Sequence, residues 1–156
     1  MITTAIPIEM TTVEALAERE RLLDEVEHIR VAALELPSLT PEERREVVDR
    51  IVDFLQGDLS AHADTEERRF YPFVADALGD WRVAAPMLYD HHAIQKATAR
   101  LKQTSVHDVP RLQELLYGLH AVITLHFEKE GELYRPFPHG GSVEHHVRRR
   151  NGHGDD

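Results

Sequence analysis

The sequence predicts an all-α protein folded as an up-down-up-down four-helix bundle. Three observations support this prediction. Four segments carry apolar residues at intervals of three and four, which is the period of a single buried helix face. The connections between these segments are short, so consecutive helices should lie antiparallel. Segments with the alternating pattern of β-strands are essentially absent from the 156 residues.

The first predicted helix covers about residues 12–36 and ends where Pro37 interrupts the pattern. The second begins with the string TPEE, whose threonine suits the N-cap, whose proline suits the first helical position, and whose second glutamate completes a capping box. We expect this helix to end near Pro72 or, with a further turn, at Gly79. Its buried stripe has members three or four residues apart: Val48, Ile51, Leu55, Leu59, His62, Glu66 and Phe70.

The third and fourth predicted helices complete the bundle. The third covers about residues 83–104, with Pro86 in its first turn. Its buried stripe consists of Ala84, Leu88, His91, Ile94, Thr98 and Leu101. The fourth begins at Asp108, an aspartate N-cap that is followed by an early proline. Its buried stripe consists of Leu112, Leu115, Leu119, Val122, His126, Glu130 and Leu133.

The composition restricts the classes of function and location. A formal net charge of −10 argues against sequence-independent binding to nucleic acid or to an anionic membrane. The absence of cysteine excludes disulfides, thiolate zinc sites and cysteine-ligated clusters. We find no signal-peptide pattern and no apolar stretch of the roughly 20 residues that span a bilayer. We therefore expect a cytoplasmic protein with an N-terminal extension (1–11), one bundle domain (12–137) and a polar, histidine-containing tail (138–156).

The strongest functional signal is a motif that occurs twice. The string HADTEERRFYPF begins at His62 and HFEKEGELYRPF begins at His126. Each contains a histidine with a glutamate four residues later, and then a tyrosine and a proline. Residues four apart share one face of a helix, and both pairs continue an apolar stripe, so Glu66 and Glu130 should point inward with their histidines. A buried carboxylate without a partner costs several kcal/mol, so this arrangement favours a bound metal ion.

The two remaining helices are each expected to add one histidine. His28 precedes His62 by 34 residues and His91 precedes His126 by 35, which indicates an internal duplication of a helical hairpin. The duplication alone nominates His28, because this residue lies off the main apolar stripe of its helix. His91 continues the stripe of its helix, so we prefer it to the adjacent His92, which should support a ligand or be exposed.

The sequence thus nominates six metal ligands: His28, His62, Glu66, His91, His126 and Glu130. Four imidazoles and two carboxylates can hold two ions, with the glutamates as bridges. These nitrogen and oxygen donors suit iron, manganese or zinc rather than calcium, and the spacing alone does not select iron. The residues leave two alternatives open, which are metal storage, delivery or sensing without turnover, and a structural bundle whose polar level is satisfied by hydrogen bonds.

Several other polar residues receive a simpler interpretation. Glu67 could accept a hydrogen bond from an imidazole, but a solvated helix face is the preferred interpretation. Tyr71 and Tyr134 follow the two glutamates and should close the end of the bundle, and a role at the mouth of the pocket is the secondary interpretation. Four histidines of the tail are interpreted as solvated: His139, His145, His146 and His153.

These motifs resemble those of the hemerythrin-like family in its HHE-type cation-binding form. The matching pieces are EH at Glu27-His28, HADTEERRFYP from His62, DHH from Asp90, and HFEKEGELYRP from His126. The resemblance implies a four-helix bundle that holds two iron ions as an oxo- or hydroxo-bridged non-haem centre, with manganese or zinc as substitutes. It further implies one iron on His28 and His62, the other on His91 and His126, and Glu66 and Glu130 as bridges.

The resemblance also implies small-molecule partners, namely O2, peroxide or NO, and identifies no protein partner. The chain departs from the oxygen-carrying hemerythrins at two positions. Gln95 stands four residues after His91, where the resemblance leads us to expect the second histidine of a His-x-x-x-His pair, and Glu130 stands in place of an aspartate. A centre richer in carboxylates argues against reversible oxygen carriage and leaves room for oxidative chemistry or peroxide decomposition. Ferritin-like bundles repeat Glu-x-x-His on two helices, whereas the motif repeated here has the opposite order, so we set that fold aside.

Overall fold

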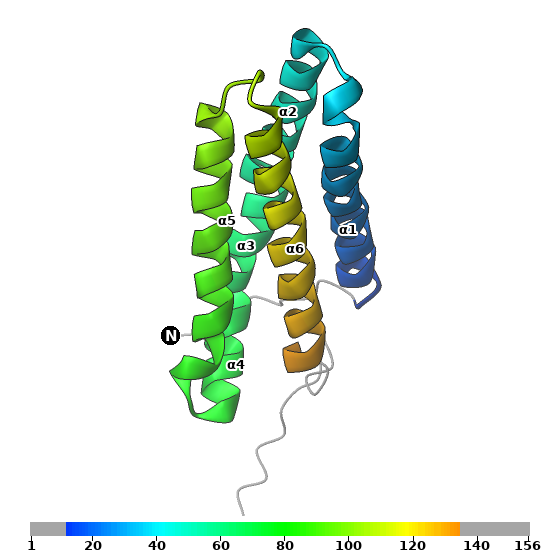
Figure 1. Ribbon diagram of the computed structural model, residues 1–156. Coiled ribbons are helices and arrows are strands. Elements are labelled where there is room, and N and C mark those ends of the chain that lie inside the picture. The colour runs from blue at the N-terminus through cyan, green and yellow to red at the C-terminus, as the bar shows by residue number, and fades with distance from the viewer. Residues whose placement is uncertain (1–11, 135–156) are drawn as a thin grey trace, which may run out of the picture.

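The computed structural model describes residues 12–134, and it confirms the all-α bundle predicted from the sequence (Figure 1). Four rods alternate in direction. The first is α1 (Thr12–Glu35), which ends in the short 3-10 turn η1 (Leu36–Ser38). The third is α5 (Ala85–Gln103), preceded by the 3-10 turn η3 (Trp81–Ala84), and the fourth is α6 (Val109–Tyr134). The N-terminal extension and the histidine-containing tail predicted from the sequence lie outside the described residues.

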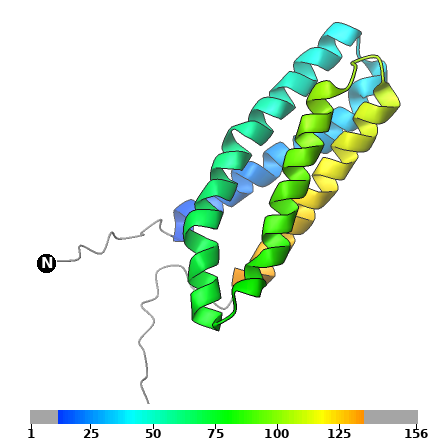
Figure 2. The same ribbon diagram turned by 90° about the vertical axis from the view of Figure 1, so that its left-hand side faces the viewer.

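The second rod is long and interrupted (Figure 2). It consists of α2 (Pro41–Gln56), α3 (Asp58–Thr65), the π-helical turn η2 (Glu66–Phe70) and α4 (Tyr71–Leu78). Gly57 separates α2 from α3, and a Cβ added there would lie 2.7 Å from the carbonyl oxygen of Asp53, so only glycine fits this junction. The rod continues beyond Pro72 and includes the further turn, up to Gly79, that the sequence allowed.

The ends of the second rod are fixed by local hydrogen bonds. The hydroxyl of Thr40 accepts from the backbone N–H of Glu43, whose carboxylate accepts from the backbone N–H of Thr40, which is the capping box expected from the string TPEE. At the other end Gly79 adopts a left-handed conformation with φ of +68° and terminates α4. These two caps set where the rod begins and ends, and hence the height at which its polar residues meet the other helices.

Apolar side chains fill the bundle on both sides of a polar level. The main core joins the four rods through buried residues such as Leu22, Ile51, Leu101 and Leu119. A smaller cluster lies where α4 meets η3 and α5, and its buried members are Tyr71, Ala84 and Met87. Between them lie the buried polar residues Glu66, His91, His126 and Glu130. Thr98 is also buried, but it lies on α5 between Ile94 and Leu101 of the main core, and its hydroxyl bonds to its own helix. None of the described helices combines the length and the apolarity that crossing a bilayer requires.

Candidate metal centre

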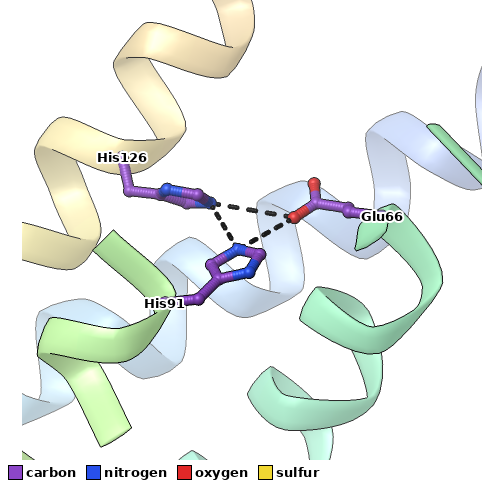
Figure 3. Close-up of side chains that lie close together, drawn as sticks. All are labelled: Glu66, His91 and His126. Carbon is purple, nitrogen blue, oxygen red and sulfur yellow. Dashed lines mark hydrogen bonds and ion pairs between the residues drawn. The ribbon is translucent and has the colours of Figure 1, made fainter. Parts of the chain in front are cut away.

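Five of the six residues nominated by the sequence come together at this polar level. Nε2 of His62 lies 3.0 Å from Oε1 of Glu66, and Nε2 of His126 lies 3.0 Å from Oε1 of Glu130, so each His-x-x-x-Glu pair is joined across one helical turn. Nε2 of His91 lies 3.4 Å from Oε2 of Glu66 and links α5 to the second rod. Figure 3 shows Glu66, His91 and His126 converging from three different rods.

The donor atoms form two overlapping groups that share Glu66. One group consists of Glu66, His91 and His126, and the other consists of His62, Glu66 and Glu130. Within each group the candidate ligand atoms lie within 4.8 Å of one another. In the first group the Nε2 atoms of His91 and His126 are 3.2 Å apart, a separation that suits two imidazoles facing one ion. The arrangement offers two adjacent positions for cations, with Glu66 between them.

Each of the three histidines also has a carboxylate on its outer ring nitrogen. Nδ1 of His91 lies 2.7 Å from Glu67, and Nδ1 of His126 lies 3.1 Å from Asp90. Nδ1 of His62 lies 3.5 Å from Oε1 of Glu18. A carboxylate on Nδ1 fixes the orientation of the ring and leaves Nε2 directed into the centre, as metal-binding histidines require.

The buried histidines and glutamates of the cluster shift one another's pKa values. Burial lowers the pKa of His62 and of His126, but contacts with Glu130 and Glu66 outweigh burial and raise each pKa to about 10. The pKa of His91 is raised in the same way by Glu66 and Glu67. Burial and the neighbouring Glu66 raise the pKa of Glu130. Although burial opposes it, hydrogen bonding with Glu130 and the histidines holds the pKa of Glu66 well below its usual range.

The residues fit a bound cation. Nε2 of His62 and Oε1 of Glu130 are buried, and neither makes a hydrogen bond of acceptable geometry within the described part of the chain. Buried polar atoms that remain unsatisfied are costly, and both belong to the same donor group. Without metal, the cluster balances its carboxylates with protonated imidazoles. A metal ion would take over that charge balance and would also bind these two atoms directly.

The structure does not bring His28 to this centre. Its side chain is 70% exposed, and its Nδ1 lies 3.5 Å from Glu25 on the same helix. The reason is that His28 and His62 lie at different distances from the connection that joins the first rod to the second. His28 precedes the end of α1 by only seven residues, about 10 Å, whereas His62 follows the start of the next rod by 21 residues, about 32 Å. The 34-residue spacing therefore places the two histidines at different heights, which corrects the single level expected from the duplication.

At the height of the centre, α1 presents Glu18 and Arg19 instead of a histidine. Glu18 faces Nδ1 of His62, and Nη2 of Arg19 donates a hydrogen bond of 2.8 Å to the carbonyl oxygen of Phe127 on α6. The guanidinium lies against Gly131, where a side-chain Cβ would meet it at 3.2 Å. Helix α1 thus contributes a carboxylate and a cation around the centre, and the described residues of the centre provide three imidazoles rather than four.

Sequence reasoning missed several residues that touch the centre. Glu67 contacts His91 although it was interpreted as solvated, and Asp90 was given no role although it precedes His91 directly. Tyr71 was assigned to closing the bundle, yet its hydroxyl contacts both Glu66 and His91. A usable signal was present, because Glu67 and Asp90 are each adjacent to a nominated ligand and Tyr71 belongs to the repeated motif. His92 is exposed.

One of the comparisons with known proteins supports a cation-binding site in this chain. A family model described as the hemerythrin HHE cation binding domain matches residues 11–137, which is most of the chain. Neither the search of curated proteins nor the search of solved structures found a match. The matched range includes all four rods and every residue of the two donor groups.

Proposed function

The chain belongs to the hemerythrin HHE cation-binding domain family, and on that premise we propose that it is a non-haem di-iron protein that binds or reacts with O2, peroxide or NO. The observation that carries the proposal is the pair of donor groups joined by Glu66. His91 and His126 would hold one ion with Glu66, and His62 and Glu130 would hold the other with the same carboxylate. Nitrogen and oxygen donors of this kind suit iron, and also manganese or zinc.

The protein's own contribution is to orient the ligands and to control access. Bound iron supplies the redox chemistry that side chains lack. The outer carboxylates hold the imidazoles so that their Nε2 atoms face inward, and the apolar residues above and below the polar level limit access to the centre from the two ends of the bundle. Glu66 is held as a carboxylate among the three histidines, which suits a residue that contacts both positions.

A cavity connects the centre with the surface between the second rod and α5. Its volume is about 270 Å³, and it is lined by the rings of His62, His91 and His126 together with residues one and two turns away, among them Leu59 and Gln95. This volume exceeds what a diatomic gas or peroxide needs. Small oxidants can therefore reach the ligand-bearing face of the centre without separation of the helices, which supports a reactive rather than a purely structural site.

A second candidate function is iron storage, delivery or sensing without turnover. The observation that favours it is the partial exposure of His62, whose side chain is 19% exposed against 3% for His91 and His126. An ion held on that side would exchange with solvent more readily than one held by the two buried histidines. Under this alternative the same ligands bind metal, but no oxidant is consumed.

Elemental analysis and an absorption spectrum of the purified protein test the proposal. We expect iron to be present, and we expect the reduced protein to develop a new visible band on addition of O2 or peroxide. A band that reverses under vacuum indicates carriage, whereas a band that decays with consumption of the oxidant indicates turnover. Loss of iron during oxidation supports delivery, and a well-folded sample that neither contains nor takes up metal would contradict both functions.

Two matched substitutions separate the centre from the surface. His126→Ala should remove most of the bound metal, because it deletes a buried ligand and leaves Glu66 and Glu130 poorly balanced. His28→Ala should leave the metal content unchanged, because that side chain is exposed and belongs to neither donor group. Equal losses in the two variants would contradict the assignment of the centre.

A further inference from the structure

The hydroxyl of Tyr71 lies inside the candidate centre. It donates a hydrogen bond of 3.1 Å to Oε2 of Glu66 and lies 3.3 Å from Nε2 of His91. These are the same two atoms that face the cation position of the first donor group. The ring is buried, with 3% exposure, and packs obliquely on the imidazole of His91 with centroids 5.7 Å apart. The phenol oxygen is therefore held at the centre from two directions.

The π-helical turn η2 is what brings Tyr71 to this place. In an α-helix, residues five apart point about 140° away from each other, so Tyr71 would not share the face of Glu66. In η2 the backbone N–H of Tyr71 bonds to the carbonyl oxygen of Glu66, five residues earlier, which stacks the two residues on one face. Single π-helical turns are frequent at functional sites because they redirect a side chain in this way.

The spacing between histidine and tyrosine in the repeated motif agrees with the presence of this π-helical turn. Tyr71 follows His62 by nine residues, whereas Tyr134 follows His126 by eight. The first copy is thus one residue longer between its histidine and its tyrosine. The π-helical turn accommodates that extra residue, and it lies immediately after the ligand Glu66. The longer interval therefore changes the direction of one side chain while the bundle continues beyond it.

We propose that Tyr71 is a ligand, its phenol oxygen binding the cation that is held by Glu66, His91 and His126. The inference rests on the proposed function, in which that cation is iron. When the oxygen binds, the hydroxyl proton leaves to solvent and the phenolate oxygen takes its place as donor. A ferric ion favours such a hard oxygen ligand, so this position differs from the second one, whose described donors are His62, Glu66 and Glu130.

The absorption and resonance Raman spectra of the ferric protein test this assignment. Protein loaded with Fe²⁺ and then oxidised in air should show a broad visible charge-transfer band, with enhancement of tyrosine ring vibrations on excitation into it. Tyr71→Phe removes only one oxygen atom and keeps the buried ring, so the variant should fold and retain His91, His126 and Glu66 as ligands. We expect the band to disappear in this variant and the Fe³⁺ affinity to fall by roughly tenfold.

Tyr89→Phe is the matched control, because Tyr89 lies on α5 close to His91 but is 78% exposed. Its spectrum should equal that of the unsubstituted protein. Iron-containing protein without tyrosine vibrations, or an unchanged band in Tyr71→Phe, would overturn the ligand assignment and leave the proposed function standing. Protein that binds no iron at all would overturn both. Metal content and circular dichroism, measured on the same samples, distinguish these results.

Discussion

Asp90 on α5 and His126 on α6 are joined by a contact of 3.1 Å between Oδ2 and Nδ1. The same carboxylate oxygen pairs with Nζ of Lys129, which lies one turn further along α6. One side chain of α5 therefore orients a candidate ligand of α6 and is itself paired with an ammonium group of α6. The contact shows that the helices of this bundle position each other's ligands, in addition to supplying their own.

Replacing Asp90 should weaken metal binding without unfolding the protein. Asp90→Asn keeps the size of the side chain but removes the charge that holds the ring of His126, and loss of such a partner typically costs about 10–100-fold in affinity. Competition with a coloured chelator measures the change. Asp64→Asn, at an exposed position of α3, is the control and should bind metal normally. Identical affinities for the two variants would contradict a role of Asp90 in positioning His126.

The two cation positions should fill with unequal affinity. The first contains two imidazoles that are almost fully buried, whereas the second contains only His62, whose outer partner Glu18 is 3.5 Å away. Stepwise titration with Co²⁺ or Fe²⁺ should show a second ion that binds at least about tenfold more weakly than the first. His62→Ala should abolish the weaker step and keep the stronger one, while His91→Ala should abolish the stronger step. Two equal steps would contradict this asymmetry.

The stability of the metal-free protein should decrease as the pH rises from about 7 to about 10. The pKa values of His62 and His126 are raised to about 10, above the ordinary value of 6.5, by Glu66 and Glu130 in spite of burial. Groups with a raised pKa stabilise the folded state fully below the unfolded pKa, and this contribution is lost as the pH passes through the folded value. Urea unfolding with a chelator present measures it. A slope that His62→Gln does not reduce would contradict this origin.

Two glycines of α6 should respond differently to the same substitution. A Cβ added at Gly118 would meet no described atom within 4 Å, so Gly118→Ala should raise the free energy of unfolding by about 0.5–1 kcal/mol. At Gly131 the Cβ would lie 3.2 Å from Nη2 of Arg19, so the guanidinium must move and its bond to Phe127 weakens. Gly131→Ala should therefore gain less or lose stability. Chemical denaturation of both variants decides the comparison, and equal gains would show that Arg19 yields freely.

The two His-x-x-x-Glu pairs could be predicted from the sequence because the signals that define them are local. The pairs His62 with Glu66 and His126 with Glu130 lie four residues apart on helices whose apolar period is regular, so their direction follows from helix geometry. The capping box at Thr40 likewise involves only four consecutive residues. The role of Tyr71 could not be derived in this way, because α-helical geometry turns it away from Glu66 and only the π-helical turn restores the contact.

By itself, the sequence determined the four rods, their apolar faces and the inward direction of the two His-x-x-x-Glu pairs, because these depend on the period of a helix and on caps of a few residues. Only the tertiary structure decided which side chains share one height. It excluded His28, brought Glu18 to His62 and Asp90 to His126, and directed Tyr71 into the centre. The physical reason is that height depends on where each rod begins, ends and changes its winding, and small differences there accumulate at about 1.5 Å per residue.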